Sequence, residues 1–135
     1  MRLEIGQTLV FAEGRPFGAA GAYELLLGRA YYEVDPAAPE QASIVDIALA
    51  PPGADGLVHF AGDVAILRPL DPSRGNRRLF FDWGNRGNKR ALQYFNDAAP
   101  GNLPLSRAQA GNGFLMRRGY TVVWGAWQGD LLPGD

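Results

Sequence analysis

The sequence lacks cysteine, and it contains a single histidine, His59, and a single lysine, Lys89. Without cysteine the chain cannot form disulfides, thiolate metal sites or cysteine nucleophiles. One histidine cannot build an all-histidine zinc site within one chain. We therefore expect no metal site in this protein.

The charge balance and the hydropathy exclude further classes of partner. Thirteen basic and fourteen acidic side chains leave a net charge of -1, whereas nucleic acid and anionic lipid attract a basic excess. No apolar run approaches the ~18 residues of a spanning helix, and Arg2 and Glu4 interrupt any signal-peptide core. We expect a cytoplasmic protein that binds neither nucleic acid nor membrane, with a leader removed from the natural protein as the alternative.

Residues 1–75 have the pattern of an antiparallel, β-rich part. A chain of 135 residues is long enough for one domain with a core of its own. Apolar and β-branched runs separated by Pro and Gly predict a meander of strands over residues 23–34, 44–49 and 57–67. The pair Ala61-Gly62 interrupts the last run, where we expect a β-bulge.

Residues 76–135 change to a strand, helix, strand pattern. The expected elements are an apolar strand ending at Asp82, a helix capped by Asn88, a second helix opened by a Ser106/Gln109 capping box and stopped at Gly119, and a strand over residues 120–124. Strand, helix, strand is the crossover unit of a parallel sheet, so the predicted fold class is α/β with a β-rich N-terminal part. Too few helices and strands follow to cover the last strand, and we expect a portion of a longer protein.

Several short motifs follow one another in a recognisable order. They are Gly18-x-x-Gly21-x-Tyr23-Glu24, Gly28, YEVDP (32–36), IVDIALAP (44–51), DVAILRP (63–69), FDWGNRG (81–87), RGYTVVW (118–124) and WQGD (127–130). This ordered set resembles the front end of a bacterial family known as alpha/beta hydrolase domain proteins. The resemblance implies that residues 76–135 start an incomplete α/β-hydrolase sheet. It also implies an intact protein that is a serine hydrolase on carboxylic esters or related acyl substrates, with no cofactor.

In that fold the loop after a central strand supplies backbone amides that stabilise the oxyanion of the reacting carbonyl. The matching residues here are Gly84, Asn85, Arg86 and Gly87. Without the resemblance these residues favour an ordinary strand-to-helix loop, and with it the two interpretations are equally supported.

The catalytic nucleophile, acid and histidine of the fold come later in chain order than this loop. None of the serines, Ser43, Ser73 and Ser106, lies in a Gly-x-Ser-x-Gly setting, and His59 precedes the predicted hydrolase core. We therefore expect no catalytic residue in this chain and no activity of the chain as it stands. The expected partner of the intact protein is a small acyl substrate, and the open sheet edge predicts self-association.

Two further sets of residues are candidates for the site. Asp82 is the acidic residue of a predicted buried strand, and we expect it to be a structural acid bound to Arg86 or to amides of residues 84–88. Trp83, Trp124 and Trp127 lie near predicted strand ends, where they line a cleft or, equally, pack in the core.

The alternative function is a non-catalytic, β-rich module that binds a small ligand or a partner through the tryptophan cluster. A nucleotide is disfavoured as that ligand, because Gly84-x-x-Gly87 and Gly111-Asn112-Gly113 both miss the G-x-G-x-x-G fingerprint.

Overall fold

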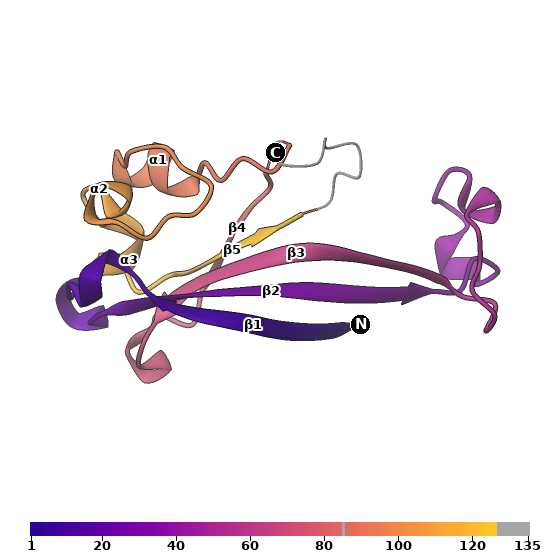
Figure 1. Ribbon diagram of the computed structural model, residues 1–135, viewed down its shortest axis with the longest axis horizontal. Coiled ribbons are helices and arrows are strands. Elements are labelled where there is room, and N and C mark those ends of the chain that lie inside the picture. Colours follow the sequence, from indigo (N-terminus) through magenta and orange to yellow (C-terminus); the bar gives the residue numbers. More distant parts are fainter. Residues whose placement is uncertain (85, 127–135) are drawn as a thin grey trace.

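The computed structural model describes residues 1–84 and 86–126. Its strands form one mixed sheet in the order β1-β2-β3-β5-β4 (Figure 1). Their bounds are β1 Arg2–Val10, β2 Tyr23–Val34, β3 Val58–Pro69, β4 Leu79–Asp82 and β5 Thr121–Gly125. Neighbouring strands are antiparallel except β4 and β5, which are parallel. The fold is therefore of the α+β type, with the predicted antiparallel part and the predicted parallel pair in the same sheet.

β2 and β3 form the long central ribbon of the sheet. Their register runs without a shift from Tyr23 opposite Pro69 to Val34 opposite Val58, so the predicted bulge at Ala61-Gly62 is wrong. Gly62 is needed for a close backbone contact, because a Cβ at this position would collide with the carbonyl oxygen of Ala126. The glycine thus lets the backbone that leaves β5 pass close to β3.

The segment between β2 and β3 contains no strand. The apolar run at residues 44–49 was predicted to be extended, but it forms turns and a short 3-10 helix over Ile47–Leu49 at the far end of the ribbon (Figure 1). In this connection the backbone makes local turn hydrogen bonds, from Ile47 N–H to the Ile44 carbonyl and from Leu49 N–H to the Asp46 carbonyl, in place of strand pairing. Val45 is consequently exposed instead of paired.

β1 is an edge strand that the sequence patterns did not reveal. It pairs with β2, and its register shifts between Ile5 and Gln7, on either side of Gly6. Because side chains alternate between faces along a strand, this shift moves the later residues of β1 to the other face. Residues 2–5 alternate between polar and apolar side chains, and the alternation is interrupted at Gly6-Gln7.

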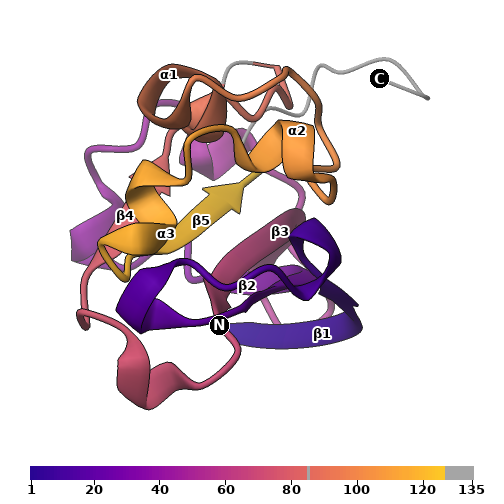
Figure 2. The same cartoon turned by 90° about the vertical axis from the view of Figure 1, so that its left-hand side faces the viewer.

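Three short helices cover one face of the sheet: α1 Ala91–Asn96, α2 Arg107–Ala110 and α3 Phe114–Arg117 (Figure 2). The core lies between this layer and the strands, where Leu25, Leu67 and Val122 are completely buried. Across it the buried Tyr23 hydroxyl of β2 donates toward the carbonyls of Met116 and Tyr120, and burial raises its pKa.

The predicted second helix is divided in two. Ser106 and Gln109 form the expected capping box, but Gly111 and Gly113 have φ values of 55° and 72° and end the helical geometry. A Cβ at Gly111 would collide with the Asn96 carbonyl oxygen, so α1 packs directly on this break. No helix in the described part of the chain is long and apolar enough to cross a bilayer.

Candidate functional site

A cavity of about 530 Å³ lies beside the carboxyl ends of β4 and β5. It is lined by Gly6, Gln7, Leu27, Gly28, Asp63, Val64, Ala65, Gly84, Gly87, Asn88, Lys89, Asn102, Leu103, Trp124, Gly125 and Ala126. Its size is within the roughly 300–1,000 Å³ that small-molecule sites occupy in proteins. The walls are largely apolar, and the polar side chains come from the loop after β4, from β3, from Gln7 of β1 and from Asn102 in the loop after α1.

The glycine loop after β4 forms one wall of this cavity. Gly84 and Gly87 line it, whereas Arg86 is exposed and Asn85 lies outside the described residues. Arg86 and Gly87 adopt φ values of 52° and 77°, so the chain makes a tight left-handed turn here. The loop predicted to be the oxyanion loop therefore borders a space large enough for a ligand.

The start of α1 is capped by a side chain from the preceding strand and not by the residue next to the helix. Asn88 was predicted to cap the helix, but the N-cap residue is Arg90, whose side chain makes no capping hydrogen bond. Instead, Asp82 Oδ2 accepts hydrogen bonds from the backbone N–H groups of Arg90, at 2.8 Å, and Ala91, at 2.7 Å. A carboxylate at a helix start satisfies donors that have no partner within the helix.

The same Asp82 oxygen also accepts a hydrogen bond of 2.7 Å from the indole Nε1 of Trp124. These partners lie at residues 90, 91 and 124, whereas the sequence predicted Arg86 or the amides of residues 84–88. Asp82 thus joins the end of β4, the start of α1 and β5, which are three elements around the cavity.

The three tryptophans have different surroundings. Trp124 lines the cavity and is 4% exposed. Trp83 is 69% exposed, contacts the Phe81 ring edge-on at 5.9 Å between centroids and does not line the cavity. Trp127 lies outside the described residues.

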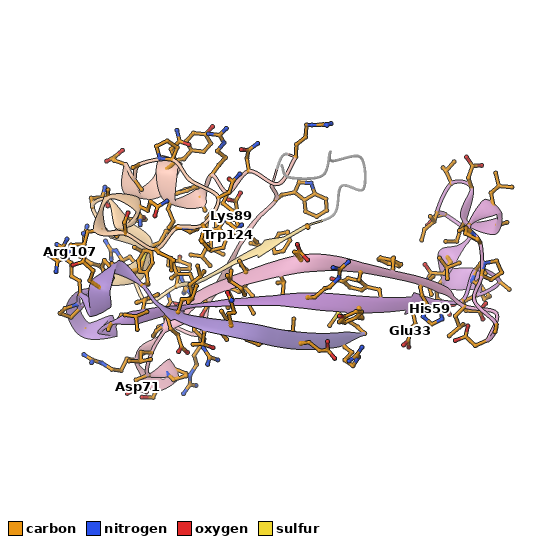
Figure 3. The ribbon with its side chains drawn as sticks, viewed as in Figure 1. Glu33, His59, Asp71, Lys89, Arg107 and Trp124 are labelled. Atoms are coloured by element: carbon orange, nitrogen blue, oxygen red, sulfur yellow. The ribbon has the colours of Figure 1, made fainter. Side chains whose placement is uncertain are left out.

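Lys89 belongs to the site, although none of the sequence motifs indicated it. Its Nζ donates a 2.6 Å hydrogen bond to the carbonyl oxygen of Asn102, and its backbone N–H donates to Asn102 Oδ1 at 3.1 Å. Burial lowers the pKa of the Lys89 ammonium, while the carboxylates of Asp63 and Asp82 act in the opposite direction. In Figure 3, Lys89 lies close to Trp124, on the helix side of the sheet. The available signal was its position as the sole lysine directly after the glycine loop.

The candidate nucleophiles and the histidine are all outside the cavity. His59 lies toward the far end of the ribbon, where its Nε2 is 2.9 Å from Asp55 Oδ2 (Figure 3). Ser106 caps α2, and the Ser73 hydroxyl donates to Asp71. Within residues 1–84 and 86–126, no group of three His, Asp or Glu side chains could hold a metal ion.

Comparisons with family models, curated proteins and solved structures found no match for this chain. The inference of function therefore depends on the geometry of the cavity and on the order of the sequence motifs.

Proposed function

We propose that this chain is the N-terminal part of a serine hydrolase with an α/β-hydrolase fold, acting on carboxylic esters or related acyl substrates. In this proposal the chain contributes the acyl-binding cavity and one side of the oxyanion hole. The nucleophile, the acid and the catalytic histidine belong to a later part of the protein.

The position of the cavity is the observation that carries this proposal. It lies at the carboxyl ends of the parallel strands β4 and β5, which is the end where open sheets with parallel strands bind their ligands. The glycine loop between β4 and α1 lines it. In α/β hydrolases the corresponding strand-to-helix loop donates one of the oxyanion-hole hydrogen bonds.

The chemistry assigned to this loop is stabilisation of negative charge on the substrate. During acyl transfer the carbonyl oxygen becomes an oxyanion, and one fixed donor is worth roughly 10²–10³ in kcat. Gly84 and Gly87 carry no side chain, so an acyl group can approach the backbone closely. Leu27, Val64 and Trp124 offer apolar contacts to the rest of the acyl chain.

An activity assay of the chain alone tests whether the catalytic residues belong to a later part of the protein. With p-nitrophenyl butyrate as substrate, we expect no turnover above buffer, because the Ser-His-acid constellation that acyl transfer needs is absent from the cavity. A His59→Ala variant should behave identically. Turnover that disappears in this variant would contradict the proposal.

The coding sequence of the natural protein gives the second test. We expect the reading frame to continue into a Gly-x-Ser-x-Gly strand-to-helix turn, followed by an acidic residue and then a histidine. Purified from its source, that protein should be labelled at this serine by a fluorophosphonate. A stop codon directly after Asp135 would reject the hydrolase.

A non-catalytic ligand-binding module is the second candidate. It is favoured by one observation: this chain by itself lines the cavity, and the lining includes neither serine nor histidine. Two results together would favour this module over the hydrolase. They are the stop codon just described and binding of a small apolar ligand at Gly84 and Trp124.

A further inference from the structure

We propose that Lys89 anchors a carboxylate in the cavity, so that the substrate is an acyl compound with a second, ionised carboxylate at the end of a short apolar chain. The inference rests on the proposed function, because it names the substrate class for the same cavity. A half-ester of a short dicarboxylic acid has this chemistry.

The distribution of charge along the cavity wall is the first argument. Among the lining residues that the structure describes, Lys89 is the cation and Asp63 the carboxylate. The Asp63 side chain is 82% exposed and lies 3.8 Å from the guanidinium of Arg29 on the neighbouring strand. Solvent and Arg29 therefore moderate its charge, whereas Lys89 is half-buried.

The hydrogen bonds of Lys89 are the second argument. An ammonium group has three N–H donors, and the carbonyl oxygen of Asn102 accepts one of them. Within the described part of the chain, no carboxylate lies within 4.0 Å of Lys89 Nζ. A neutral carbonyl supplies no negative charge, so the ammonium depends on the more distant carboxylates of Asp63 and Asp82. Its remaining donors match the two oxygens of a carboxylate. Charge-assisted bonds of this kind are about twice as strong as neutral ones.

Burial is the third argument. It lowers the pKa of Lys89, which means that the charged form has lost part of its hydration. The groups that oppose this effect are Asp63 on β3 and Asp82 at the end of β4, and Asp82 already accepts three N–H donors through one oxygen. A bound carboxylate would compensate the charge more directly than either of them.

The remaining wall defines the middle of the ligand. Leu27, Val64, Ala65 and Trp124 present apolar surface in the same cavity as Lys89 and the glycine loop. A chain of a few methylene groups fits this surface, with the ester carbonyl at Gly84 and Gly87 and the carboxylate at Lys89. The ligand class is thus an apolar linker with an acyl group at one end and an anion at the other.

Two esters of equal length test this inference. Monomethyl adipate carries a carboxylate where methyl hexanoate carries a methyl group, and both are titrated into the ¹⁵N-labelled chain while the amides of Gly84 and Gly87 are observed. We expect monomethyl adipate to bind at least about tenfold more tightly, the ratio that corresponds to ~1.4 kcal/mol.

Lys89→Met should remove this ratio while leaving the affinity for methyl hexanoate within about twofold, because the substitution keeps an unbranched apolar stem and deletes only the charge. Lys89→Arg should retain most of the preference. Arg107→Met is the matched control, since Arg107 is an exposed cation that lies far from the cavity (Figure 3). It should leave both affinities unchanged.

The outcomes separate this inference from the proposed function. Equal binding of the two esters, or a preference that survives in Lys89→Met, overturns the role of Lys89 but leaves the acyl-binding cavity intact. If neither ester perturbs Gly84 or Gly87, the proposed function fails as well. Should Lys89→Met not fold, methyl 6-aminohexanoate replaces it: binding weaker than that of methyl hexanoate supports the anchor, and tighter binding contradicts it.

Discussion

Asp82 acts on three elements through one carboxylate oxygen. The two N–H groups at the start of α1 and the indole N–H of Trp124 have the same acceptor, and all three hydrogen bonds are 2.7–2.8 Å long. The helix start therefore depends on a residue from the preceding strand. The glycine loop, whose two ends are attached to this strand and this helix, is held by the same carboxylate.

Replacing this carboxylate should destabilise the protein. We expect Asp82→Ala to lower the free energy of unfolding by about 2–3 kcal/mol, because three partly buried donors lose a charged acceptor. Asp82→Asn should have a smaller effect, since one acceptor oxygen remains. Urea unfolding followed by tryptophan fluorescence measures both. Asp71→Ala is the control, because Asp71 caps only an exposed turn, and an equal loss in this variant would argue against the role of Asp82.

The amine of Lys89 should react at lower pH than an ordinary lysine. Burial lowers its pKa below the usual 10.5, so the neutral, nucleophilic form is populated earlier as the pH rises. Since Lys89 is the sole lysine, acetylation with an N-hydroxysuccinimide ester can be followed on one peptide by mass spectrometry. We expect a midpoint below 10.5.

The carboxylate of Asp63 holds this pKa up, because it stabilises the ammonium form. Asp63→Asn should therefore move the acetylation midpoint further down. Glu33→Gln, which removes a carboxylate at the far end of the ribbon (Figure 3), should not move it. A midpoint that rises in Asp63→Asn would show that the sign of this interaction is wrong.

At the level of elements, glycines determine how closely the strands approach one another. Gly28 on β2 faces the carbonyl oxygen of Glu4 on β1, and a Cβ at Gly28 would collide with it. Gly6 lies at the register shift of the same pair, where an added Cβ would have its nearest contact at 3.9 Å. The two glycines are similar in sequence context but differ in the space around them.

This difference predicts opposite results for two alanine substitutions. Gly28→Ala should weaken the attachment of β1 and cost at least ~1 kcal/mol, because the clash involves backbone. Gly6→Ala should be nearly neutral. Hydrogen exchange of the β1 amides should accelerate in Gly28→Ala and stay unchanged in Gly6→Ala. Equal exchange in both variants would contradict the assigned contact.

On the scale of the whole molecule, the two faces of the sheet differ. Helices cover one face (Figure 2), whereas on the other face Leu79 and Phe81 of β4 are exposed and Trp83 continues the same apolar row. Within residues 1–84 and 86–126, β4 also has a strand neighbour on one side only. Parallel strands are normally covered on both faces, so this surface favours association.

We expect the isolated chain to self-associate through this edge and face. Phe81→Lys should shift the sedimentation equilibrium toward monomer, because it places a charge in the apolar row. Tyr94→Lys introduces the same charge at an exposed site on α1 and should not change the equilibrium. Dissociation by both variants, or by neither, would speak against the β4 edge.

Features with local causes could be predicted from the sequence. The bounds of β2 were predicted because an apolar and aromatic run is closed by Asp35-Pro36, and the capping box at Ser106 needs only residues three positions apart. The helix cap at Asp82 could not be predicted in this way, because its acceptor and its donors belong to different elements. β1 was missed for a related reason, since the shift at Gly6 has meaning only against the register of β2.

The same distinction between local and long-range causes applies to the candidate site. The sequence alone determined a glycine loop after an apolar strand, a sole lysine directly beyond it, and a chain without a nucleophile elbow. The tertiary structure decided that Gly28, Asp63 and Lys89 border one cavity. Strand order and register bring such distant residues together. Contacts between residue pairs far apart in the sequence determine both the order and the register. No short stretch of sequence encodes those pairs, because each strand's alternation is compatible with several neighbours.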